Sequence, residues 1–108
     1  MQVSISGKQI DLGDSFRAHV EARVSSGVSK YFNGAIDAHV VVSHEAHLFR
    51  TDYTVHVGTG IDAQAHASAD DVRASFDLAA EHLEKQLRRH KRKLRDHHRA
   101  AKDAAKEE

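Results

Sequence analysis

The fold is decided by two neighbouring stretches in which apolar and polar residues alternate, Ile36-Asp-Ala-His-Val-Val-Val-Ser-His-Glu45 and Phe49-Arg-Thr-Asp-Tyr-Thr-Val-His-Val57. Successive side chains of a strand point to opposite faces of a sheet, so this alternation predicts two strands that each have one apolar face. A few residues around Ala46 and His47 join them, which predicts a hairpin. The residues expected to face the core are Val40, Val42, Tyr53, Val55 and Val57.

One strand and one helix are predicted before this hairpin. Val3 and Ile5 alternate with polar residues, as in a short strand. Asp14 is expected to cap a helix that runs to about Phe32, where Asn33-Gly34 ends it. The apolar face of this helix has members four residues apart: Phe16, Val20, Val24 and Val28.

After the hairpin, a glycine-containing turn leads to a weaker strand, Ile61 to Ser68, whose inward residues are mostly alanine. Asp70 or Asp71 is expected to cap a long final helix. The predicted order is therefore β-α-β-β-β-α. Because alternating strands bury one face only, both helices are expected to pack on that face of a four-stranded sheet, in an α+β fold.

The final helix carries a concentrated positive charge. From Lys85 to Glu108 there are ten Lys/Arg and four Asp/Glu, whereas residues 1–84 hold six Lys/Arg and twelve Asp/Glu. The formal net charge of zero thus hides a pole of +6 and a pole of −6. Asp96 alone interrupts residues 85–102, so the acidic partners typical of a merely solvated helix face are nearly absent. Such a surface is typical of a protein that binds a polyanion.

Helical periodicity separates the apolar and basic residues of this helix. At about 100° per residue, the apolar residues lie within about 40° of one line, and a basic band lies roughly opposite. The apolar line contains Val72, Phe76, Leu83, Leu87, His90 and Leu94, so a buried ring is expected for His90. The band contains Lys85, Arg88, Arg92, Arg95 and Arg99, flanked by Arg89, Lys91 and Lys93. The band is about 21 Å long, enough to follow several phosphates.

The start of the final helix resembles the second-helix signature of the ribosome hibernation-promoting factors, also called ribosome-associated inhibitors or sigma-54 modulation proteins. The segments that carry the resemblance are Asp71-Val-Arg-Ala-Ser-Phe-Asp77 and the following Leu-Ala-Ala-Glu-His-Leu-Glu-Lys-Gln-Leu-Arg-Arg-His-Lys. Ile5-Ser-Gly-Lys-Gln-Ile10 and Lys30-Tyr-Phe32 are similar to the start of the family's sequence and to the end of its first helix. The resemblance covers roughly residues 1–98.

This resemblance implies a β-α-β-β-β-α fold, similar to a double-stranded-RNA-binding domain, and an activity that is not enzymatic. It implies docking in the decoding region of the small ribosomal subunit, on 16S-type rRNA, where the protein blocks tRNA and mRNA sites and silences translation during nutrient limitation. It implies no cofactor and no small-molecule substrate. Arginine suits this task because its planar fork grips a phosphate or stacks on a base.

The predicted RNA-binding residues come from matching positions and from the basic band. Those on the final helix are Lys85, Arg88, Arg89, Arg92, Lys93, Arg95 and Arg99. Those near the first strand and helix are Lys8, Arg23 and Lys30.

Two other functions would use the same basic helix. A generic double-stranded-RNA-binding module shares every electrostatic feature with a ribosome binder, and only the family motif separates the two. A membrane-surface or coiled-coil helix is disfavoured because the apolar face is narrow and lacks Trp.

Neither the ten histidines nor any other motif predicts a metal or catalytic site. His44-Glu-Ala-His47 falls one residue short of the zinc-binding His-Glu-x-x-His spacing. His39, His56 and His66 are expected to share the wet face of the sheet, but no cysteine or carboxylate is expected to converge with them. The nucleophile elbow, the phosphate-binding glycine loop and the dinucleotide fingerprint are all absent from the sequence, so an enzyme is not predicted.

Length and composition predict one small domain. The chain has no cysteine and no apolar run of signal-peptide or transmembrane length, so a cytoplasmic location is expected. Residues 1–99 are predicted to form the ribosome-binding domain, and residues 100–108, with no apolar side chain larger than alanine, a polar tail or the start of a linker. Long members of the resembling family continue into a second domain that pairs two ribosomes. The chain is therefore expected to be a short-form factor or the first domain of a long one, and to silence single ribosomes without pairing them.

Overall fold

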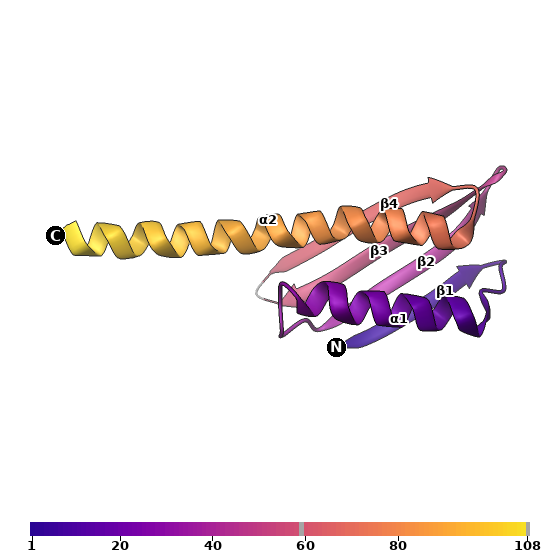
Figure 1. Cartoon of the computed structure of the whole chain (residues 1–108), viewed down its shortest axis with the longest axis horizontal. Helices are drawn as coiled ribbons and strands as arrows, with labels where there is room; N and C mark the ends of the chain where they lie inside the picture. The colour runs from indigo at the N-terminus through magenta and orange to yellow at the C-terminus, as the bar shows by residue number, and fades with distance from the viewer. Residues whose placement is uncertain (59, 108) are drawn as a thin grey trace.

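The structure, a computed structural model, describes the backbone of residues 1–58 and 60–107 and the side chains of these residues up to residue 94. Its elements are β1 (Gln2–Lys8), α1 (Gly13–Ser29), β2 (Asp37–Glu45), β3 (Leu48–Gly58), β4 (Ile61–Ala69) and α2 (Val72–Glu107). This is the predicted β-α-β-β-β-α order. Both helices lie on the same side of the sheet, and the C-terminal half of α2 continues beyond it (Figure 1).

The four strands form one mixed sheet in the order β1-β2-β3-β4. β1 is parallel to β2, whereas the β2–β3 and β3–β4 pairs are antiparallel. Glu45 pairs with Leu48, so Ala46 and His47 alone form the predicted hairpin turn. Ala46 has a φ of 56°, within the left-handed region that tight hairpin turns use. The two alternating stretches therefore form the two central strands.

The core lies between the sheet and the two helices. Val40, Val42, Tyr53 and Val55 are at most 1% exposed, as predicted, and Val57 is partly buried against them. The helix residues buried with them are Phe16, Val20, Val24, Gly27, Val28, Phe76, Ala79, Ala80, Leu83 and Leu87. The small buried side chains of β4, Ala63 and Ala67, leave room for α2 to pack close to the sheet.

Polar contacts fix the start of α2 over the sheet. Asp71 caps the helix, because its Oδ2 accepts the backbone N–H of Ala74 at 3.1 Å. The Ser75 hydroxyl donates to the Val72 carbonyl oxygen at 2.7 Å, and Ser75 and Thr51 of β3, both fully buried, share a 2.7 Å hydrogen bond. The Ser75 hydroxyl has one proton, which it donates to Val72, so the Thr51 hydroxyl is the donor in the hydrogen bond between Thr51 and Ser75. The buried polar pair is thus satisfied and locks α2 onto β3.

Side chains of the helices also reach the two outer strands. Gln86 of α2 forms two hydrogen bonds with the backbone of Gln64 in β4: its Oε1 accepts the N–H at 3.3 Å, and its Nε2 donates to the carbonyl oxygen at 2.7 Å. At the opposite edge of the sheet, Arg17 of α1 donates to the carbonyl oxygen of Ile5 in β1 at 3.0 Å. Each helix is therefore held to the sheet by a polar contact with an outer strand as well as by the core.

The two helices contact each other closely at Gly27 and Glu84. A Cβ atom at Gly27 would lie 2.7 Å from Glu84 Oε2. The same oxygen accepts a hydrogen bond from Nε of Arg23 at 2.8 Å. About two turns earlier in α2, Asp77 Oδ1 lies 2.7 Å from Nε2 of His19. The absence of a side chain at residue 27 makes room for a carboxylate that ties α2 to α1.

Two details differ from the prediction. α1 begins at Gly13, with Leu12 as its N-cap and no side-chain cap, so the predicted Asp14 cap is wrong. Asp14 lies in the first turn, where its charge complements the helix dipole. Ile36, the first apolar residue of the predicted alternation, is 59% exposed because it precedes β2 and lies next to Gly58 at the end of the sheet.

We expect Leu83→Ala to lower the free energy of unfolding by about 2–5 kcal/mol, because it empties a fully buried position between α2 and the sheet. Urea unfolding followed by circular dichroism measures this. Leu94→Ala is the matched control in the same helix: Leu94 is 51% exposed, and its replacement is expected to cost less than about 0.5 kcal/mol. An unchanged urea midpoint for Leu83→Ala would contradict the packing described above.

Gly27→Ala tests the contact between the helices. Alanine is favoured over glycine in a helix by about 1 kcal/mol, but here its Cβ displaces Glu84, which releases Arg23. We therefore expect the substitution to bring no gain in unfolding free energy in the natural sequence, and the full gain in a Glu84→Ala background. The same effect in both backgrounds would mean that Gly27 and Glu84 are not coupled.

Candidate nucleic-acid interface

The basic half of α2 begins where this helix ceases to cover the sheet (Figure 1). Among the described side chains of α2, those up to residue 94, Leu87 is the last that is fully buried. His90, predicted to be buried, is only half-buried, and Leu94 is 51% exposed. The prediction of a buried ring for His90 is wrong, because α2 continues beyond the sheet (Figure 1) and the C-terminal part of its apolar stripe has less to pack against.

The predicted cations of α2 whose side chains the structure describes all face solvent. These exposed residues are Lys85, Arg88, Arg89, Arg92 and Lys93. Lys85 lies 3.7 Å from Glu81, one turn earlier. The other four form no ion pair with any carboxylate among the described side chains. Their charges are therefore available to a partner.

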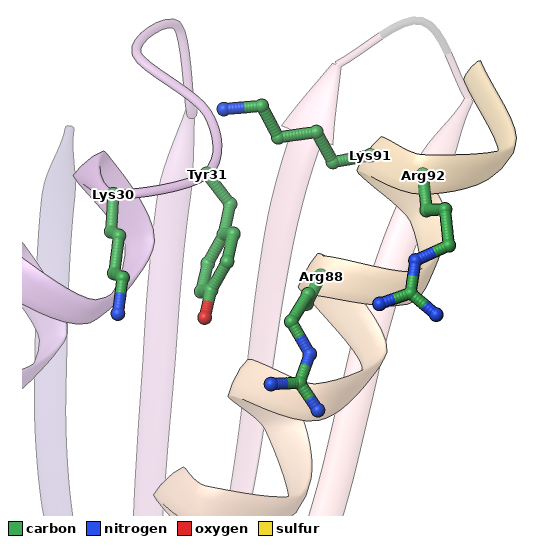
Figure 2. A pocket seen from close by; sticks show the side chains of 5 residues that line it. All are labelled: Lys30, Tyr31, Arg88, Lys91 and Arg92. Atoms are coloured by element: carbon green, nitrogen blue, oxygen red, sulfur yellow. The ribbon is translucent and has the colours of Figure 1, made fainter. Parts of the chain in front are cut away.

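Two hollows lie along this surface. The larger, about 220 Å³, runs between α2 and the end of α1 and is lined by Lys30, Tyr31, Arg88, Lys91 and Arg92. Figure 2 shows the Tyr31 ring between Lys30 and Arg88. The smaller, about 140 Å³, lies among Lys85, Arg88, Arg89 and Arg92. Arg88 and Arg92 line both hollows, so these two arginines are the centre of the surface.

Lys30 thus joins the cations of α2 although it is distant in sequence. It lies at the C-terminal end of α1, and its Nζ is 5.6 Å from the centroid of the Tyr31 ring, in the range of a cation–π contact. The residues gathered here are called the basic surface: Lys30, Tyr31, Lys85, Arg88, Arg89, Lys91, Arg92 and Lys93.

Arg23 and Lys8 lie elsewhere. Arg23 binds Glu84 at 2.8 Å and lies 4.0 Å from Asp77, and the hydrogen bond to Glu84 raises the pKa of its guanidinium. Its charge therefore serves the contact between the helices. Lys8 ends β1 at the opposite end of the sheet from the basic surface (Figure 1). The side chains of Arg95 and Arg99 lie outside the described residues.

Sequence reasoning left out two members of the basic surface. The sequence pattern places Lys91 only on the flank of the basic band, and Tyr31 only within a motif. The signal that identifies them is the hollow itself, which forms because α1 ends beside α2. That geometry follows from the packing of the two helices and has no trace in the local sequence pattern.

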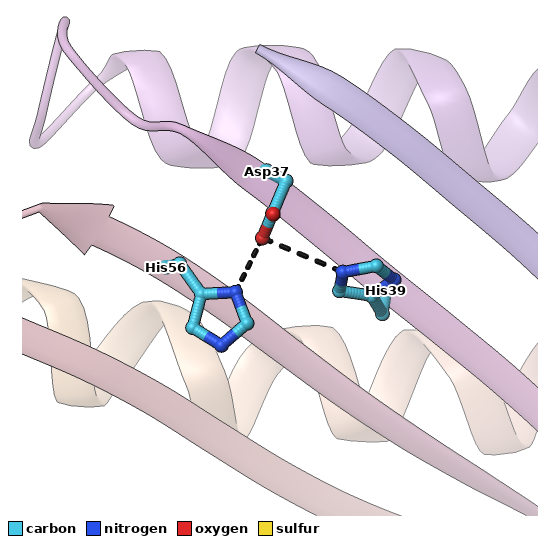
Figure 3. A group of neighbouring side chains, drawn as sticks. All are labelled: Asp37, His39 and His56. Carbon is cyan, nitrogen blue, oxygen red and sulfur yellow. Dashed lines mark hydrogen bonds and ion pairs between the residues drawn. The ribbon is translucent and has the colours of Figure 1, made fainter.

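The outer face of the sheet carries a second cluster of charge, made by Asp37, His39 and His56 (Figure 3). Asp37 Oδ1 forms a short contact with Nδ1 of His56 and lies 3.5 Å from Nε2 of His39. The prediction that no carboxylate converges with these histidines is therefore wrong. The hydrogen bond between them lowers the pKa of Asp37 and raises the pKa of His56. His66, on β4, lies apart from this cluster and pairs with Asp52 of β3 in the strand register.

In the part of the chain that the structure describes, neither helix is long and apolar enough to cross a membrane.

Known proteins resemble this chain in sequence. It is 42% identical to the ribosome hibernation promotion factor of Rhizobium meliloti (strain 1021) over 91% of this chain and 52% of that protein. It is 32% identical to the ribosome hibernation promoting factor of Escherichia coli (strain K12) over 90% of this chain and 100% of that protein. The chain thus spans about half the length of the first relative and the whole length of the second.

A solved structure and a family model are also similar to this chain. The crystal structure of the Thermus thermophilus Protein Y N-terminal domain is similar with a TM-score of 0.74 and 26% identity, over 82% of this chain and 98% of that one. The model of a family described as sigma 54 modulation protein / S30EA ribosomal protein matches residues 3–95. The chain therefore belongs to the sigma 54 modulation protein / S30EA ribosomal protein family.

Proposed function

We propose that this protein is a ribosome-associated translation inhibitor that binds rRNA of the small subunit through the basic surface. Docked in the decoding region, it blocks the sites of tRNA and mRNA during stress or stationary phase. The observation that carries the proposal is the run of exposed cations on α2 that face no described carboxylate. The names of the two relatives, which are hibernation factors of the ribosome, support it.

The shape of the basic surface suits a nucleic-acid backbone. Arginine forks bind phosphate oxygens with two parallel hydrogen bonds, and Arg88 and Arg92 stand one turn apart so that both line the same two hollows. Tyr31 adds an aromatic ring beside them, a group on which an unpaired base stacks. Folded rRNA offers both phosphates and unpaired bases, whereas a plain duplex offers mainly phosphates.

The charge of the remaining protein gives the complex one orientation. Residues 1–84 carry twelve acidic and six basic residues, so this part of the molecule is repelled by RNA. The basic surface, to which residues 1–84 contribute Lys30 and Tyr31, attracts it. The protein would therefore approach the subunit with the free half of α2 first.

The proposed activity is occupancy, without chemistry on a substrate. It requires residues 1–99, of which those beyond Leu94 extend the same helix, and it takes place in the cytoplasm, where ribosomes are. Residues 100–108 are proposed to be a polar tail or the start of a linker, outside the binding domain.

Charge reversal on α2 tests the proposal. We expect Arg88→Glu to weaken binding to the small subunit by about 10–100-fold, the loss of one charge-assisted contact, and Arg88→Glu with Arg92→Glu to abolish it. Arg73→Glu is the matched control, because it makes the same charge change on an exposed residue at the other end of α2. Filter binding or sedimentation with purified subunits measures the affinities.

Salt dependence adds a second reading of the same variants. If about four to five phosphates are neutralised, the log–log slope of affinity against salt should be about −3 to −4.5. Arg73→Glu should keep this slope. Full binding by a folded double variant would remove the basic surface from the proposal.

Competition separates ribosome inhibition from generic RNA binding. We expect mRNA and initiator tRNA, bound beforehand to the small subunit, to exclude the protein, because the three share one site. A plain RNA duplex in equal amount is the control and is expected to compete poorly. Simultaneous binding of all three ligands, or equal competition by the duplex, would favour a double-stranded-RNA-binding module instead.

A further inference from the structure

Three side chains with metal-binding atoms converge on the outer face of the sheet, the face that the helices do not cover (Figure 3). Asp37 and His39 stand two residues apart on β2 and so share one face. His56 on β3 lies directly opposite Asp37 in the strand register. One donor atom from each of the three lies within 4.8 Å of the other two.

We propose that Asp37, His39 and His56 bind a divalent transition-metal ion of the zinc type. Two imidazoles and one carboxylate are the donor set of open zinc sites, which complete their tetrahedron with water. The side chains of His39 and His56 are 47% and 40% exposed, so an ion reaches them from solvent, and a fourth position stays open. Calcium and magnesium do not suit this site, because they prefer oxygen donors.

The scaffold beneath the trio is rigid. β2 and β3 are the two central strands, each paired along both sides. Asp37 and His56 are therefore held opposite each other by the strands themselves. Sites built on paired strands hold their ligands more accurately than sites on loops.

A carboxylate also stands behind one of the ligands. With Nδ1 of His56 directed at Asp37, its Nε2 lies 4.0 Å from Asp62 on the neighbouring strand. In metal sites a ligating histidine usually directs its other ring nitrogen to a carboxylate, which orients the ring. In the metal-free protein a hydrogen bond joins Asp37 to His56, and Nε2 of His39 lies 3.5 Å from the same carboxylate oxygen. A bound ion would take the place of the proton in that hydrogen bond.

Two other histidines have contacts of a different kind. His19 binds Asp77 and packs edge-on against Phe76, and His44 lies against the ring of Phe49. Within residues 1–58 and 60–94, Asp37, His39 and His56 form the one group of three ligand side chains whose donor atoms converge.

The experiment titrates the full chain, free of any histidine tag, with Zn²⁺ in a calorimeter and with Co²⁺ in a spectrophotometer. We expect one ion per chain, visible absorption bands of tetrahedral cobalt that zinc removes, and a higher thermal midpoint with zinc. Loss of a residue that only supports a metal ligand typically weakens binding about 10–100-fold. His39→Gln and His56→Gln each remove a ligand, so each should weaken zinc binding at least that much.

His66→Gln is the matched control, because His66 is exposed on the same face of the sheet but outside the trio. It should bind zinc like the natural protein. All three histidines are solvent-facing, so the metal-free variants should unfold at similar temperatures. The proposal is overturned if zinc does not bind in these titrations, or if His39→Gln and His56→Gln bind it as well as His66→Gln does. In the first case Asp37 and the histidines are an ion-pair cluster, and in the second the ion lies elsewhere.

Discussion

The sheet has one face that must be kept from water, and α2 is the helix that covers β3 and β4. The direction of α2 is fixed by this task, because Phe76, Leu83 and Leu87 all have to point at the strands. Once these residues face inward, the helical repeat turns Arg88 and Arg92 outward. The position of the cations is therefore a result of core packing. Any change that lets α2 rotate over the sheet would also redirect the basic surface.

Opposite charges are kept apart by contacts between the helices. Glu84 and Asp77 lie on the same helix as the cations, but they are bound to Arg23 and His19 of α1. A carboxylate that is paired with a side chain of α1 neutralises the nearby positive charges of α2 less. The packing of the helices thus preserves the positive pole that the sequence concentrates after residue 84.

The fold could be predicted from the sequence because its signals are local. Alternation in β2 and β3 and the four-residue spacing in α1 identified the elements and the buried side of each. The role of Arg23 could not be predicted in this way, since its partner is 61 residues away on another helix. The grouping of Lys30 with Arg88 has the same cause. His90 was misjudged because periodicity says which way a side chain points but not whether anything lies there.

The cluster on the outer face was within reach of the sequence, although it was missed. A two-residue turn at Ala46 and His47 fixes the register of the hairpin, and this register sets Asp37 opposite His56. The sequence predicts the hairpin, and a turn of two residues is what pairs the strands in this register. The strand register predicts which residues lie opposite each other, whereas the alternation of apolar and polar residues predicts only the face on which each one lies.

The amide of Gln86 has a consequence for how copies of this chain meet. An outer strand with free backbone groups invites a strand of another molecule to add to the sheet, which is a common route to aggregation. At Gln64 both of these groups are already bonded to Gln86, much as a neighbouring strand would bond them. Arg17 occupies a carbonyl oxygen of β1 in the same way. A strand of another molecule must break such contacts before it can extend the sheet. The helices that cover one face of the sheet therefore also protect its two edges.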